Sequence, residues 1–253
     1  MKLYQDKEWL CEKYLKEKLS TTQIGKLCKR TKVTIGRWLM IFNIPRRSQS
    51  EYHHLATKNN CRLSEEALQW INGELLGDAH LELKSCYSAR FHYGSKYLEY
   101  IEYVRDTLKS FGIEQAGNIQ RRHITHRNMD TYAYDYCSKA YPELLPIRKQ
   151  WYPEGKKIIP KDIKLTPLTL RQHYIGDGYL SHREKRNPHI ILCSDAFPIS
   201  CVNWFICQLK YLGFKTTRQP SHNRIHISSY SAKDFLSYIG ICPVQCYQYK
   251  FNY

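Results

Sequence analysis

Residues 75–81 read LLGDAHL, and residues 174–180 read YIGDGYL, 99 positions further along the chain. Each copy stands at the end of an expected helix. The first helix begins after Ser64, a favourable N-cap, and the second begins after Thr166, with Pro167 in the first helical position that proline favours. A repeat of this length predicts two pseudo-symmetric halves and not a solenoid of many short units.

The segments that follow the two copies also repeat. Alternating stretches between turn residues predict strands, and apolar residues at helical spacing predict the helices between them. In the first half we expect strands near residues 81–93, 118–126 and 131–137 and helices over Lys96–Phe111 and near 139–150. In the second half we expect strands near 179–183, 189–194, 214–219 and 224–229 and helices over Ile199–Leu212 and Ala232–Ile239. Each half therefore reads α-β-β-α-β-β-α, which predicts an α+β fold with halves at residues 63–162 and 163–253.

The composition indicates a polyanionic partner. Among 253 residues there are 39 Lys and Arg against 23 Asp and Glu, a formal net charge of +16. Such an excess favours nucleic acid or an acidic membrane surface. No apolar stretch is long enough to cross a bilayer, the N-terminus has no signal-peptide pattern, and no basic amphipathic helix stands out. We therefore expect an intracellular protein that is not secreted and faces nucleic acid, with no membrane partner.

The N-terminal quarter carries more than half of the excess charge. Residues 1–62 contain 14 Lys and Arg against 5 Asp and Glu, and the sequence predicts short helices over Glu8–Lys18, after Ser20, and over Val33–Phe42. The pattern of the last two helices resembles a helix-turn-helix, so we assign residues 1–50 to a DNA-binding module with a linker. In that interpretation Thr34 and Arg37 face the major groove, and Arg46 and Arg47 belong to a linker or a backbone-contacting arm. An ordinary three-helix module with a solvated basic face stays as the alternative.

Two of the expected strands carry rows of polar and basic residues. Arg121, His123 and Arg127 alternate along one of them, and Arg224 and His226 alternate along another. A sheet face rich in cations and hydrogen-bonding groups suits a groove of duplex DNA, so we predict that these residues contact DNA. A solvated antiparallel sheet is the alternative for each strand taken singly.

The glycines of the two motifs predict a close helix crossing. Gly73 and Gly77 lie one turn apart, and Gly176 stands at the position that matches Gly77. If the helices pack at these glycines, Asp78 and Asp177 lie side by side at two helix C-termini, where the macrodipole is already negative. Divalent cations relieve that repulsion by binding carboxylate oxygens and the free carbonyls of the helix ends.

Three stretches of the second half identify a family. Residues 152–160 read YPEGKKIIP, residues 165–170 read LTPLTL, and residues 176–178 read GDG. With the first motif, they resemble the LAGLIDADG homing endonucleases in their single-chain form, over about residues 63–253. The resemblance implies two repeats that form a DNA-binding saddle. One departure is Gly176, where many members have a second Asp; that position is not the metal ligand.

The resemblance also implies an activity and its residues. Asp78 and Asp177 match the metal-binding acidic residues, and the carbonyls of Gly77 and Gly176 are further metal ligands. Lys157 matches a basic residue that contacts the water network at the scissile phosphate, and Lys250, after Tyr249, matches its counterpart in the second half. We therefore predict a monomer that binds double-stranded DNA at a long asymmetric site. It would cleave both strands with two or three Mg²⁺ ions shared by the two aspartates.

Two alternatives stay open. A scaffold of this type also serves as a DNA-binding regulator that does not cleave, or as a maturase with intron RNA as partner, and the added N-terminal module fits a regulator.

The ten cysteines are scattered without a C-x-x-C pair, which indicates reduced thiols used as small apolar residues. A zinc site of Cys242, Cys246, His222 and His226 is a weaker alternative, because structural zinc sites usually show tighter cysteine pairs.

Overall fold

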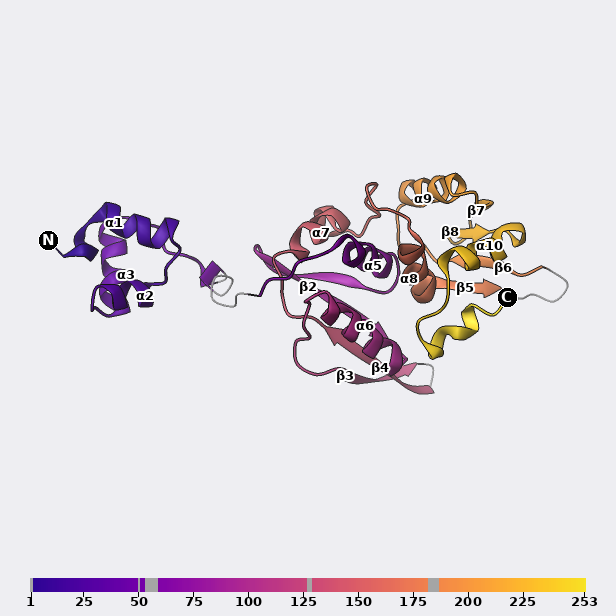
Figure 1. Cartoon of the computed structure of the whole chain (residues 1–253), viewed down its shortest axis with the longest axis horizontal. Helices are drawn as coiled ribbons and strands as arrows, with labels where there is room; N and C mark the ends of the chain where they lie inside the picture. The colour runs from indigo at the N-terminus through magenta and orange to yellow at the C-terminus, as the bar shows by residue number, and fades with distance from the viewer. Residues whose placement is uncertain (1, 50, 53–58, 127–128, 182–186) are drawn as a thin grey trace. The chain divides into compact units, whose positions relative to one another are not determined.

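The computed structural model of the chain describes residues 2–49, 51–52, 59–126, 129–181 and 187–253 (Figure 1). The chain separates into two compact units. One comprises Met1–Lys58 with Ser85–Tyr87, and the other comprises Asn59–Lys84 with Ser88–Tyr253. Within the described ranges, no helix has both the length and the apolar character that crossing a membrane requires.

The first unit is a small helical module. Its elements are the 3-10 turn η1 (Leu3–Gln5), α1 (Lys7–Cys11), the π-helical turn η2 (Glu12–Lys16), α2 (Thr21–Leu27) and α3 (Lys32–Ile41). Ser20 caps α2 in a reciprocal arrangement with Gln23, and the Thr31 hydroxyl accepts a hydrogen bond from the Thr34 amide at the start of α3. The module has its own core, which consists of Tyr4, Leu10, Tyr14, Ile24, Ile35, Leu39 and Ile44.

The second unit contains the two expected halves. The elements of the first half are α5 (Glu65–Leu76), β1 (His80–Ser85), β2 (Ser88–Ser95), α6 (Leu98–Ser110), β3 (Gln120–His126), β4 (Met129–Cys137) and α7 (Leu144–Trp151). A 3-10 turn, η3 (Pro153–Gly155), follows. Those of the second half are α8 (Pro167–Asp177), β5 (Gly178–Ser181), β6 (His189–Leu192), α9 (Ile199–Tyr211), β7 (Thr216–Gln219), β8 (Arg224–Ile227), α10 (Ser229–Ile239) and the 3-10 turn η4 (Gln245–Lys250).

The two halves have the same sheet topology. The strand orders are β1-β2-β4-β3 and β5-β6-β8-β7, and the registered pairs are antiparallel. In the second sheet Ile190, Leu192, Ile225 and Ile227 are buried on one face, beside α9 and α10 (Figure 1). The other face stays open. A single apolar core runs through both halves, so the second unit folds as one body.

The elements follow the sequence prediction, with shifted boundaries. The helix expected near residues 139–150 begins only at Leu144, because Pro142 stands before it and Pro146, which has no amide hydrogen, is accommodated in the first turn. The helix expected at Ala232 begins at Ser229, and the expected helix Glu8–Lys18 divides into α1 and the π-helical turn η2. The α+β fold with two pseudo-symmetric repeats is as predicted.

Candidate functional site

Helices α5 and α8 cross at their glycines in the centre of the second unit (Figure 1). A Cβ on Gly77 would stand 3.4 Å from the Cα of Gly176, and a Cβ on Gly73 would stand only 2.6 Å from the carbonyl oxygen of Thr169. Larger residues would force the helices apart. The crossing therefore brings together the two helix ends that carry Asp78 and Asp177, as the sequence predicts.

The two aspartates lie in a partly desolvated environment. The surrounding protein raises the pKa of Asp177 to about 7, with the charge of Asp78 as the second cause. The same desolvation raises the pKa of Asp78, while Lys250 and Lys157 act in the opposite direction. Asp78 remains exposed and Asp177 half-buried, so both carboxylates are accessible from solvent. The ionised pair is costly by itself and is favoured by an added cation.

One lysine side chain contacts the backbone of each motif. The Nζ atom of Lys157 donates to the carbonyl oxygens of Gly77 (3.1 Å) and Ala79 (2.9 Å). The Nζ atom of Lys250 donates to the carbonyl oxygens of Ile175 (2.6 Å) and Gly176 (3.2 Å). The two lysines therefore occupy equivalent positions, each against the backbone carbonyls of one motif.

The environments of both lysines lower the pKa values of their ammonium groups. Burial lowers the pKa of Lys157 to about 8, although both aspartates act in the opposite direction. Burial also lowers the pKa of Lys250, which is 8% exposed and whose carbonyl accepts a hydrogen bond from the Tyr174 hydroxyl at 2.5 Å. The arrangement therefore supplies two cations of reduced basicity, one for each motif.

The donor set fits a divalent cation at the aspartates. Two carboxylates at helix ends are hard oxygen ligands, and their raised pKa values mean that the ionised pair lacks full compensation from the protein. The carbonyls of Gly77 and Gly176 directly precede the aspartates in the chain, but each already accepts a hydrogen bond from a lysine. The aspartates are therefore the stronger ligands, and the glycine carbonyls are shared with the lysines.

Three buried polar residues near the aspartates were not predicted from the sequence motifs. Glu74 and His173 occupy matching positions, four residues before the aspartates, and burial raises the pKa of Glu74 well above its usual range and lowers that of His173 to about 4. Glu74 accepts a hydrogen bond from Tyr100 at 2.6 Å. The hydroxyl of Tyr93 is fully buried and lies 3.7 Å from the place of a Cβ on Gly176. Only the alternation of strand β2, which turns Tyr93 inward, hints at its place.

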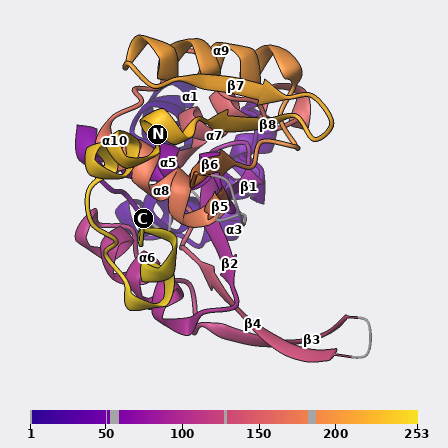
Figure 2. The same cartoon turned by 90° about the vertical axis from the view of Figure 1, so that its right-hand side faces the viewer.

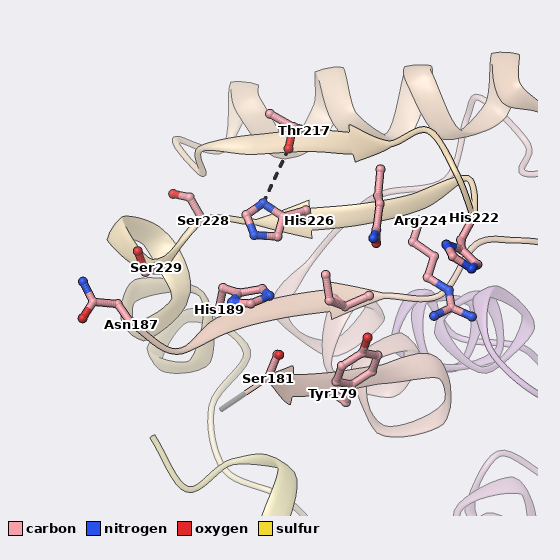
Figure 3. Close-up of a pocket in the computed structure, with 12 residues that line it drawn as sticks. Tyr179, Ser181, Asn187, His189, Thr217, His222, Arg224, His226, Ser228 and Ser229 are labelled. Carbon is pink, nitrogen blue, oxygen red and sulfur yellow. Dashed lines mark hydrogen bonds between the residues drawn. The ribbon is translucent and has the colours of Figure 1, made fainter. Parts of the chain in front are cut away.

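The open face of the second sheet forms a polar hollow of about 620 Å³ (Figure 3). The predicted DNA contacts Arg224 and His226 both line it, and the ring of His226 lies 4.7 Å from that of His189. Arg224 Nε lies 2.9 Å from Asp195, and His226 Nδ1 lies 3.5 Å from the Thr217 hydroxyl. The sequence pattern did not single out His189, because the register that aligns it beside His226 depends on pairing between distant strands.

In the first sheet, the strand register shows which face carries the β3 residues that were predicted to contact DNA. In the register, Arg121 pairs with Tyr134 and His123 with Tyr132, and these residues share a face with the core residues Tyr136 and Tyr93. The open face instead carries Gln120, Arg122 and Ile124 beside Gly94 and His92.

The predicted β3 residues also have local partners. The Arg121 guanidinium lies 3.6 Å from the centre of the Tyr132 ring, and His123 Nε2 lies 3.2 Å from Asp130. The β3–β4 hairpin extends away from the rest of its half (Figure 2). The predicted contact Arg127 lies outside the described residues.

The predicted DNA contacts of the N-terminal unit differ in their exposure and in their hydrogen-bond partners. Arg37 and Arg46 are exposed on one groove. The hydroxyl of Thr34 lies 3.1 Å from that of Thr31, at the helix cap. Arg47 is turned inward, where its guanidinium donates to the carbonyls of Leu19 and Tyr14 and stacks 4.1 Å from the Tyr14 ring. The Arg47 guanidinium is therefore engaged within its own unit, whereas Arg37 and Arg46 point to solvent.

The zinc alternative has no support. Within the described ranges, no three His, Cys, Asp or Glu side chains gather in a way that holds a metal. Cys242 Sγ lies 3.1 Å from the Val244 carbonyl, and His222 lies 2.8 Å from the Ser221 hydroxyl. All ten cysteines are unpaired.

Comparison with known proteins adds relatives and a structural neighbour. An uncharacterized protein of Methanocaldococcus jannaschii is 26% identical over 231 residues, which cover 91% of this chain and 88% of that protein. The cytochrome b mRNA maturase bI2 of Debaryomyces hansenii is 27% identical over 126 residues, 47% of this chain and 48% of the maturase. The homing endonuclease I-WcaI, solved bound to its DNA recognition sequence, has a similar fold with a TM-score of 0.70, at 16% identity, covering 83% of this chain and 96% of that one.

A family model described as the LAGLIDADG DNA endonuclease family matches residues 68–235. The matched segment includes both motif aspartates and reaches from the first crossing helix through the second sheet. The crossing of α5 and α8 and Lys157 lie within that segment, and Lys250 follows it in the chain. The chain therefore belongs to the LAGLIDADG DNA endonuclease family.

Proposed function

We propose that this protein is a site-specific DNA endonuclease that makes a double-strand break in a long, asymmetric duplex site. The observation that carries the proposal is the paired arrangement at the crossing of α5 and α8. Asp177 is the last residue of α8, and Asp78 lies two residues after the end of α5. Lys157 and Lys250 donate to the carbonyls of the two motifs. Membership of the family and the fold shared with a DNA-bound homing endonuclease support it.

The aspartates would hold Mg²⁺ together with DNA phosphate and water, since no group of three or more His, Cys, Asp or Glu that could hold a metal occurs among the described residues. When bound, the metal supplies charge neutralisation at the phosphate and activation of water. Lys157, with a pKa lowered to about 8, is suited to hydrogen-bond the attacking water or the phosphate oxygens on one strand. Lys250 has the matching place for the other strand.

The open faces of the two sheets would bind double-stranded DNA on either side of this centre. Arg224, His226 and His189 lie on the open face of the second sheet, with Arg122 and His92 on that of the first. One chain carries both halves of the site, so it would act as a monomer. Two sheets with different side chains suit an asymmetric sequence, because each half reads its own bases.

The N-terminal unit would add a second DNA contact. Residues 28–31 connect helices α2 and α3, and this spacing is compatible with a helix-turn-helix. Its exposed cations include Arg37 and Arg46. This contact would lengthen the recognised sequence beyond that of the two sheets.

A second candidate function is that of an intron maturase that binds RNA. The observation in its favour is the 27% identity to a cytochrome b mRNA maturase, although the chain spans about half the length of that relative. Binding of RNA by itself gives no role to two adjacent carboxylates at the helix crossing. Retention of both aspartates with their two lysines favours the nuclease.

The experiment is cleavage selection from a randomised duplex library with the full chain, in Mg²⁺ and in EDTA. We expect cleaved products with defined ends on both strands in Mg²⁺ only. Sequencing those ends would give the site and the stagger. Binding of one duplex sequence without cleavage in Mg²⁺ would favour a regulator, and binding of RNA in preference to DNA would favour a maturase.

A further inference from the structure

The outer face of helix α3 is apolar where a solvated helix would be polar. Val33 is 72% exposed and Met40 is 61% exposed, and both line a groove of about 610 Å³ on the N-terminal unit. The positively charged residues Lys32, Arg37 and Arg46 line the same groove. None of these three forms an ion pair with another residue in the part of the chain that the structure describes. The surface therefore combines exposed apolar side chains with uncompensated positive charge.

Gly36 lies in the middle of this face and has no structural reason to be glycine. Among the described residues, no atom lies within 4 Å of the place where a Cβ on Gly36 would stand. Its backbone is helical, inside α3 (Lys32–Ile41), so alanine would fit and would favour the helix. The missing side chain lowers the helix surface between Val33, Arg37 and Met40. It allows a partner to approach the helix backbone closely.

The charge and shape of the surface select duplex DNA as that partner. Three cations without acidic neighbours along the groove favour a polyanion over an ordinary protein surface. A single helix fits the major groove of B-form DNA, whereas the major groove of A-form RNA is too deep and narrow for side chains to read. Exposed apolar side chains have a specific partner in the major groove, the methyl group of thymine.

We propose that the outer face of α3 reads bases in the DNA major groove, with Gly36 at the closest approach and Val33 and Met40 against thymine methyl groups. This inference rests on the proposed DNA binding by the N-terminal unit and names how that unit reads sequence. Arg37, on the same face, would reach a base edge or a phosphate, and Arg46 a phosphate beside the groove. Thr34 is engaged at the helix cap and Arg47 is turned inward, so neither takes part.

The test is selection of bound sequences from a randomised duplex library in EDTA, with the full chain and single variants. Wild type should enrich two blocks of specified positions, one read by the sheets and one by α3. Gly36→Ala should lose the α3 block and keep the other, and Arg224→Gln should weaken the sheet block only. Leu3→Ala is the matched control, because Leu3 is an exposed apolar residue of the same unit that does not line the groove.

Two further measurements test the folding of the Gly36→Ala variant and the contacts with thymine methyl groups. Gly36→Ala should slow hydrogen exchange of the α3 amides, so loss of its block cannot come from unfolding. Replacing the selected thymines by deoxyuridine should weaken wild-type binding about fourfold for each buried methyl group that is removed. Val33→Ala should be insensitive to that replacement at its own position.

The possible outcomes distinguish failure of base reading by α3 from failure of the proposed nuclease function. A sheet block that appears without an α3 block, or two blocks that both survive Gly36→Ala, would overturn the inference and leave the proposed nuclease intact. A Gly36→Ala variant that binds more weakly with no change in the selected sequence would also overturn it, since α3 would then only contact phosphates. Failure of wild type to enrich any duplex sequence would contradict the proposed function itself.

Discussion

Gly77 and Gly176 face each other at the crossing of α5 and α8, where a Cβ on Gly77 would stand 3.4 Å from the Cα of Gly176. The contact joins the two halves at residues that immediately precede Asp78 and Asp177. Both aspartates owe their position to this backbone contact, and not to a loop that moves independently. The geometry of the site is thus set by how closely two helices pack.

Gly73→Ala should destabilise the second unit. Its Cβ would stand 2.6 Å from the Thr169 carbonyl oxygen and 2.8 Å from the Gln172 Cβ, so the helices must separate. We expect the free energy of unfolding to fall by about 1–3 kcal/mol in urea titrations. Gly36→Ala is the matched control, because it is also a helical glycine but lies in open space. It should gain up to about 1 kcal/mol in its own unit. Equal stability of Gly73→Ala and wild type would mean that the helices do not rely on this contact.

Without divalent cations, stability should depend on pH through Asp177. Its pKa rises from 3.8 to about 7 in the folded protein, so the folded state binds this proton more tightly than the unfolded state. The contribution of this group is therefore present below about pH 3.8 and is lost as the pH rises to about 7. In EDTA, Asp177→Asn should melt above wild type at about pH 8 and close to it at about pH 4. A difference in melting temperature that does not vary with pH would contradict the assignment.

Lys157→Met should slow cleavage while leaving the fold intact. The side chain is half-buried and directs its ammonium group to the Gly77 and Ala79 carbonyls, beside the aspartates. We expect the single-turnover rate in Mg²⁺ to fall by about 100-fold or more, as for other groups that stabilise charge in a transition state. Lys156→Met is the control, since Lys156 is the exposed neighbour. Similar rates for both variants would remove Lys157 from the chemistry.

Arg224→Gln should weaken specific binding to DNA. Arg224 lies on the open face of the second sheet, and its loss would also leave Asp195 without its partner. We expect a loss of about 1–3 kcal/mol in binding free energy, measured by fluorescence anisotropy with the selected site. Arg218→Gln is the control, because the register pairs Arg218 with Ile225 on the helix-packed face. It should lose less, and equally for all sequences. An equal, sequence-specific loss in both would contradict the assignment of the DNA-facing side.

The sequence predicts what depends on local spacing. Paired motifs at helix ends, glycines one turn apart, and N-caps at Ser64 and Thr166 give the halves and the meeting of Asp78 with Asp177. The sequence does not show that Arg121 and His123 share a sheet face with Tyr136 and Tyr93, because alternation within one strand shows which residues share a face but not which face packs against helices. That choice is made by the pairing of β2 with β4, far apart in the chain.

Arg47 and Tyr93 show the same limit at single residues. Arg47 follows an arginine in a basic segment, which suggests a DNA contact, yet it stacks on Tyr14, 33 residues earlier. Tyr93 reaches the helix crossing from a strand without any motif. Contacts of this kind arise from tertiary packing, which no local pattern encodes.

We propose that Asp78 and Asp177 form a metal-dependent centre for cleavage of both DNA strands. The most direct measurement compares wild type and Asp177→Asn on the selected duplex, recording binding in EDTA and strand cleavage in Mg²⁺. We expect closely similar binding by the two proteins, double-strand cleavage by wild type, and no double-strand cleavage by Asp177→Asn. Cleavage of both strands by Asp177→Asn at the wild-type rate would contradict it.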